Sequence, residues 1–118
     1  MAKPAKCISV DQARQLQDNW ISTRALEIER AQGNVDTREF FYTVDELQEY
    51  LDYVKELSKK QKIDNPGIRI YFAAYDDISD DKATVFLAPT EGATPSSNIN
   101  YNIDPFNKSI GGWPPKSY

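Results

Sequence analysis

The stretch Gly67–Thr90, GIRIYFAAYDDISDDKATVFLAPT, is the most hydrophobic part of the chain and predicts two β-strands joined by an acidic turn. Residues alternate along Ile68–Tyr75, and successive side chains of a strand point to opposite faces of its sheet. The returning strand is expected over Ala83–Ala88, because Pro89 cannot donate to a sheet ladder. We therefore expect a β-hairpin with two different faces, around which the other elements are arranged.

The two faces of this hairpin have different chemistry. The first carries apolar side chains that we expect to face the helices as the core: Ile68, Ile70, Phe72 and Ala74. The second carries Arg69, Tyr71 and Tyr75, and arginine and tyrosine dominate binding hot spots. Together with Tyr101 and Trp113 from the C-terminal segment, this face is the candidate binding surface. The alternative is that the C-terminal segment packs on it and completes the core.

The N-terminal third of the chain predicts helix. Ser9 and Gln12 match a capping box, and Gly33 is a strong helix stop. The apolar stripe rotates partway along this segment. Either one helix runs over Val10–Gln32 with a broad buried face, or two helices meet near Asn19–Thr23.

The middle of the chain predicts the clearest helix, Val44–Lys60, with Thr43 and Glu46 as its capping box. Three consecutive aromatic residues just before it favour a short strand over Glu39–Tyr42. The fold class is therefore α+β, with two to three helices on one face of a small, mainly antiparallel sheet. The sheet is mixed if Glu39–Tyr42 and Ile68–Tyr75 are joined by a right-handed parallel crossover.

The chain of 118 residues predicts a single domain over 9–118, after a flexible leader at 1–8. Residues 91–118 are rich in Gly, Pro, Ser and Asn, which is typical of a loop, yet aromatic and aliphatic residues recur among them. Ile99, Tyr101 and Ile103 alternate like a short strand. We expect this tail to wrap over the sheet, anchored by its aromatic residues.

Composition excludes several functional classes. The net charge is −4 and no basic patch is present, so a nucleic-acid partner is not expected. There is no histidine, which removes Ser-His and Cys-His catalysis and the usual zinc sites, and Cys7 is alone and cannot form an intrachain disulfide. No apolar run approaches the ~20 residues of a membrane helix, and the N-terminus lacks a signal-peptide pattern. A cytoplasmic protein with no cofactor and no membrane partner is expected.

The acidic turn of the hairpin is a weak candidate for a divalent-metal site. Its carboxylates are Asp76, Asp77, Asp80 and Asp81. A calcium-binding EF-hand loop starting at Asp77 requires glycine and glutamate where this chain has Lys82 and Ala88. A solvated turn is therefore the favoured interpretation, and no catalytic motif is present elsewhere.

Three pieces of sequence, GIRIYF at 67–72, TVFLAPT at 84–90 and the late Gly-Gly-x-Pro-Pro at 111–115, resemble a family of small, uncharacterised bacterial proteins. The resemblance extends from the first helix to the C-terminus. It implies an intact domain in the bacterial cytoplasm and carries no activity, cofactor or site residue.

Two functions are compatible with these patterns. The first is a non-enzymatic interaction module that binds another protein or a copy of itself. The alternative is a small-ligand binder or enzyme, with a pocket between the sheet and the C-terminal tail. That alternative requires a deep pocket with a carboxylate near Arg69. In such a pocket Arg69 would bind an anion, and Tyr71 or Tyr75 would donate a hydrogen bond.

Overall fold

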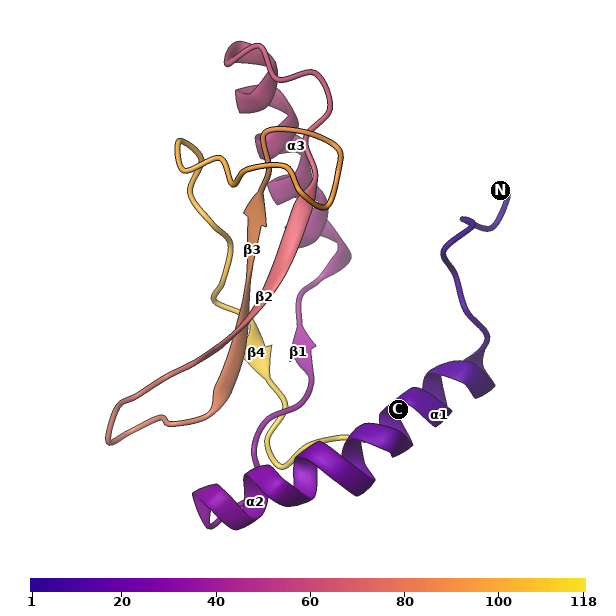
Figure 1. The fold of residues 1–118 in the computed structure, drawn as a ribbon, viewed down its shortest axis with the longest axis vertical. Helices are drawn as coiled ribbons and strands as arrows, with labels where there is room; N and C mark the ends of the chain where they lie inside the picture. Colours follow the sequence, from indigo (N-terminus) through magenta and orange to yellow (C-terminus); the bar gives the residue numbers. More distant parts are fainter.

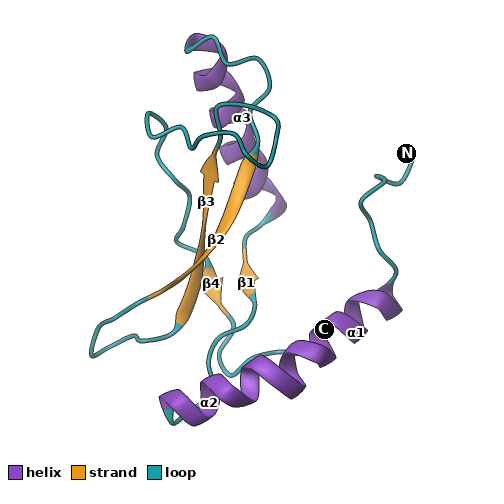
Figure 2. Cartoon of the chain, in the orientation of Figure 1, coloured by secondary structure: helices purple, strands orange, loops and turns teal.

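The structure is a computed structural model that describes residues 1–118. Its helices are α1 (Val10–Trp20), α2 (Leu26–Gln32) and α3 (Val44–Lys60), and its strands are β1 (Phe40–Phe41), β2 (Ile68–Ala74), β3 (Ala83–Pro89) and β4 (Ile110–Gly111). The strands form two antiparallel pairs, β1 with β4 and β2 with β3 (Figures 1 and 2). The predicted α+β class is confirmed. The parallel crossover is wrong, because β1 pairs with β4 and not with β2.

The N-terminal helices form one continuous rod, because a π-helical turn at Ile21–Ala25 joins α1 to α2. A π turn places one extra residue in the helix, which explains why the apolar stripe rotates at this point. The capping box of Ser9 is present, and Gly33 ends the rod with φ +82°. We call Val10–Gln32 the N-terminal arm, since it projects sideways at the end of the molecule away from α3 (Figure 1).

The core lies between α3 and the hairpin. Thr43 and Glu46 form the expected capping box, which starts α3. From α3, the side chains of Tyr50 and Val54 reach Leu87 of β3, and Ile103 of the tail completes this buried cluster. The helix therefore holds one end of the hairpin, and the tail is anchored to the same cluster.

The hairpin has the predicted strands to within one residue, since β2 ends at Ala74 and β3 includes Pro89. Its register is continuous, from Ile68 opposite Pro89 to Ala74 opposite Ala83. The expectation that Ile70 and Phe72 belong to the core is wrong, since they are 69% and 82% exposed. Ile68 packs against the core cluster, but Ile70 and Phe72 are not among the residues packed against it. The N-terminal arm reaches this region, where Trp20 stacks on Phe72.

The tail behaves as a wrapping segment but forms no strand over Ile99–Ile103. Thr90 and Ile99 make an isolated bridge, Ile103 is 3% exposed and Tyr101 is 89% exposed. Beyond it, a second bridge joins Phe106 to Leu87. The tail is thus attached along β3, and the outer edge of β2 has no strand beside it.

The chain is elongated. Its radius of gyration is 16.7 Å, whereas a compact domain of this length has about 13.5 Å. Its accessible surface is 9293 Å², whereas a compact monomer of 13.5 kDa exposes about 6,500 Å². None of the helices is both long enough and apolar enough to cross a membrane.

Candidate functional site

Arg69, the predicted anion-binding residue, is covered by the tail. Its Nη2 donates to the carbonyl of Pro95 at 2.6 Å and also to the carbonyl of Ser97. These acceptors belong to the loop that follows β3, and no carboxylate pairs with this guanidinium. Arg69 therefore holds the tail on the sheet, and the deep carboxylate pocket required by the ligand-binding alternative is not found beside it.

Tyr71 and Tyr101 lie together on this face. Tyr71 stacks on Phe86 of β3 with 5.1 Å between ring centroids. Tyr71 and Tyr101 line one shallow depression of about 320 Å³, and the ring of Tyr101 is almost fully exposed. Arg69 does not line this depression.

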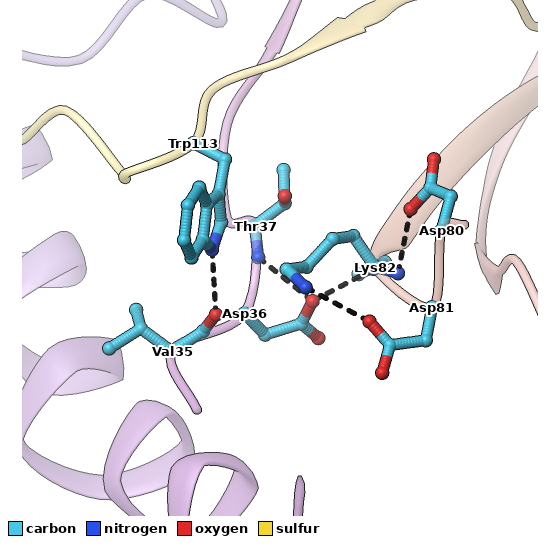
Figure 3. A network of polar contacts seen from close by, with 8 residues as sticks. Val35, Asp36, Thr37, Asp80, Asp81, Lys82 and Trp113 are labelled. Carbon is cyan, nitrogen blue, oxygen red and sulfur yellow. Dashed lines mark hydrogen bonds and ion pairs between the residues drawn. The ribbon is translucent and has the colours of Figure 1, made fainter. Parts of the chain in front are cut away.

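Tyr75 and Trp113 line a different cavity of about 380 Å³, near the hairpin turn. The Tyr75 hydroxyl lies 3.0 Å from Oδ1 of Asn107, and the Trp113 Nε1–H donates to the carbonyl of Val35 at 2.8 Å (Figure 3). The ammonium of Lys82 lies 5.2 Å from the centroid of the Trp113 ring. The five predicted binding residues therefore divide between two separate depressions and the tail contact, and they form no single site.

The acidic turn is engaged in local contacts. Lys82 donates to Asp81 at 2.9 Å, and this hydrogen bond holds the pKa of the Asp81 carboxyl below its ordinary value. Asp80 accepts from the backbone N–H of Lys82, and Asp77 accepts from Ser79. No group of three or more acidic or cysteine side chains lies close enough to hold a metal ion.

A neighbouring carboxylate, Asp36, joins the segment between the N-terminal arm and β1 to the hairpin (Figure 3). One of its oxygens accepts from the backbone N–H groups of Thr37 and Ala83, each at 2.8 Å. Together with the bond from Trp113 to Val35, these contacts fix three segments far apart in the sequence. This network therefore joins the arm, the hairpin and the tail.

A larger cavity than these two lies between the N-terminal arm and the hairpin. It is an open groove of about 650 Å³, and most of its lining is apolar. We call it the open groove, and its principal side chains are Leu16, Trp20, Ile21, Ile28, Val35 and Phe72. One polar atom stands out at its edge, since Nε of Arg38 is buried without a hydrogen-bond partner.

The open groove continues into a set of exposed apolar side chains on the arm and β2. Trp20 stacks on Phe72 with 6.2 Å between ring centroids, and this pair joins the two elements. We call the apolar face the set Leu16, Trp20, Leu26, Ile70 and Phe72. Both Leu16 and Leu26 are exposed, as are the two β2 residues. Large contiguous exposed apolar patches are characteristic of interaction sites.

Sequence reasoning placed Ile70 and Phe72, two of the five residues of this face, in the core. The available signal was the composition of β2, whose seven residues, IRIYFAA, include no lysine or proline to protect an exposed edge. The comparisons with known proteins add no further guide, since no family model, curated protein or solved structure matches the chain. The resemblance to a small bacterial family stays a prediction.

Proposed function

We propose that this protein is a non-enzymatic cytoplasmic interaction module that self-associates through the apolar face. The observation that carries the proposal is the exposure of Ile70 and Phe72, at 69% and 82%, in the middle of a regular strand. Burying an aliphatic or aromatic side chain of this size stabilises an interface by ~1.5–3 kcal/mol. The face therefore has the chemistry of an interface and not of a solvated surface.

The total area supports the same proposal. The chain exposes about 2,800 Å² more than a compact monomer of equal mass. A standard protein interface buries about 800 Å² on each partner. A second copy can therefore cover the apolar face within the excess surface of the elongated chain.

Sedimentation equilibrium of the purified protein at concentrations from about 1 to about 200 µM tests this proposal. The expected result is a mass twice that of the 13.5 kDa chain at the higher concentrations. Ile70→Asp places a charge in the apolar face and should return the protein to a monomer with an unchanged helix content. Tyr101→Asp is the matched control, because Tyr101 is exposed outside this face, and it should remain dimeric. A monomer at every concentration would overturn the proposal.

A second candidate function is the binding of a small anionic amphiphile, and the unpartnered Nε of Arg38 beside the open groove favours it. A mainly apolar groove whose polar lining residues include Arg38 suits an acyl chain with a carboxylate head that the guanidinium binds. Isothermal titration with decanoate tests this function, with Arg38→Gln as the variant. Equal heats for the two proteins would count against it.

A further inference from the structure

The outer edge of β2 is an unpaired hydrogen-bonding surface. At the two ends of the β2–β3 ladder, the backbone N–H of Thr90 donates to the carbonyl of Gly67, and the backbone N–H of Tyr75 donates to the carbonyl of Lys82. Along an antiparallel strand, the backbone N–H and C=O groups of successive residues point alternately toward and away from the neighbouring strand. The backbone groups of the odd-numbered residues of β2 therefore hydrogen-bond to β3. The backbone groups that point outward belong to the even-numbered residues Ile68, Ile70, Phe72 and Ala74.

No other strand of the chain pairs with this edge. β2 pairs only with β3, and neither isolated bridge involves β2. Exposed edges are usually protected by lysine, proline, a bulge or a covering loop. β2 contains no lysine, proline or bulge, and the loop after β3 contacts it through its one charged residue, Arg69, whose guanidinium donates to the carbonyls of Pro95 and Ser97. The edge is regular over seven residues and flanked by exposed apolar side chains.

We infer that the partner on this edge is the β2 strand of a second copy, paired antiparallel across a two-fold axis at Tyr71. The four-stranded sheet then has the order β3, β2, β2 and β3. This inference rests on the proposed self-association and adds the strand, the register and the symmetry. It makes the apolar face of one copy continuous with that of the other.

The register follows from the strand itself. Centring on Tyr71, the middle residue of β2, pairs all seven residues of one strand with all seven of the other. It also brings outward-pointing residues opposite each other, with Ile70 of each copy facing Phe72 of the second copy. Four such pairs exchange about eight backbone hydrogen bonds. Slipping the register by two residues leaves unpaired residues at both ends and removes one of these pairs.

The same register joins apolar side chains across the axis. Ile70 and Phe72 lie on one face of β2, so their copies form a cluster of four side chains at the centre of the new sheet. Trp20 already stacks on Phe72, and in the dimer it extends this cluster into the open groove of each copy. The side chains exposed in the single chain are therefore those that the pairing covers.

Single-cysteine crosslinking tests the register in a Cys7→Ser background, which removes the only native thiol. In the proposed pairing the two Tyr71 residues are directly opposite at a non-hydrogen-bonded position, where Cα atoms are ~4.5 Å apart and a disulfide can form. Under mild oxidation Tyr71→Cys should give a covalent dimer at least tenfold faster than the exposed control Tyr101→Cys. Faster crosslinking of Ile70→Cys or Phe72→Cys than of Tyr71→Cys would overturn this register.

Hydrogen exchange on the unmodified protein provides a measurement that needs no substitution. The amides of Ile70 and Phe72 should be protected at dimer concentrations and lose at least tenfold of that protection on dilution to the monomer. The amide of Tyr71 bonds to β3 and should stay protected throughout. A dimer in which the Ile70 and Phe72 amides exchange freely would overturn the edge pairing and leave the proposed self-association intact. A monomer at all concentrations would remove both.

Discussion

Replacing Phe72 by alanine separates the two roles that a large apolar residue of a strand can have. A core phenylalanine loses ~3–5 kcal/mol of folding stability on truncation to alanine. Phe72 is 82% exposed, and its ring stacks on the ring of Trp20. Such aromatic pairs contribute ~0.5–1.5 kcal/mol, so we expect the monomer to lose about 1 kcal/mol or less.

The effect of the same substitution on association should be much larger. Burial of one phenylalanine contributes ~2 kcal/mol, and a two-fold interface contains two copies of the residue. The loss of ~4 kcal/mol raises the dimer Kd about a thousandfold, at 1.4 kcal/mol for each factor of ten. The Kd is measured by sedimentation equilibrium, and the stability of the monomer by urea unfolding at concentrations below the Kd.

Tyr101→Ala is the matched control, because Tyr101 is also an exposed aromatic residue but lies outside the apolar face. It should change neither the Kd nor the urea midpoint by more than the experimental error. If Phe72→Ala lowers the stability of the monomer by 3 kcal/mol or more while the Kd is unchanged, Phe72 is a core residue and the reasoning is refuted.

Three further predictions concern the fold. Tyr50→Phe removes a hydroxyl that donates to the backbone carbonyl of Asp104 at 2.9 Å, and it should lower the free energy of unfolding in urea by ~1–2 kcal/mol. Because burial raises the pKa of Tyr50 to about 12, the native protein should also lose stability as the pH rises above 10, and the variant should lack this loss. The backbone N–H of Thr43 holds the pKa of the Glu46 carboxyl below its ordinary value, so the stability that this carboxylate contributes is present above the ordinary pKa of a glutamate and is lost as the pH falls through the lowered pKa; Glu46→Gln should flatten the acid side of the thermal-midpoint profile, and an unchanged profile contradicts this. Gly33→Ala should cost ~1 kcal/mol and shorten the helix by circular dichroism, because φ is +82° while no atom obstructs the new Cβ; an unchanged spectrum and midpoint would argue against it.

The elements that sequence reasoning predicted well are those fixed by local hydrogen bonds. The capping boxes at Ser9 and Thr43 need only groups three residues away, and Gly33 needs only its own backbone freedom. The rotation of the N-terminal stripe was also a correct local signal. The structure resolves it as a π-helical turn at Ile21–Ala25 rather than a break between two helices.

The covering of each face depends on contacts that have no local signature. Arg69 donates to the carbonyl oxygens of Pro95 and Ser97, which lie 26 and 28 positions later in the chain. Every residue has a backbone carbonyl, so the sequence cannot identify these acceptors. The pairing of Phe40 with Gly111 likewise joins distant two-residue strands. For Ile70 and Phe72, alternation correctly predicted a shared face but could not show that the helices stop short of it.

The small core gives this uncovered face a thermodynamic consequence. Only 12 of 118 residues are buried in the single chain, whereas a domain derives most of its stability from apolar burial. A partner that binds only the folded state adds stability by mass action, ~2.7 kcal/mol at a hundredfold excess over the Kd. If the chain self-associates as proposed, its folding and association are linked, and the thermal midpoint should rise with protein concentration. The tail covers the Arg69 face from within the chain, whereas in the proposed dimer a second copy covers Ile70 and Phe72.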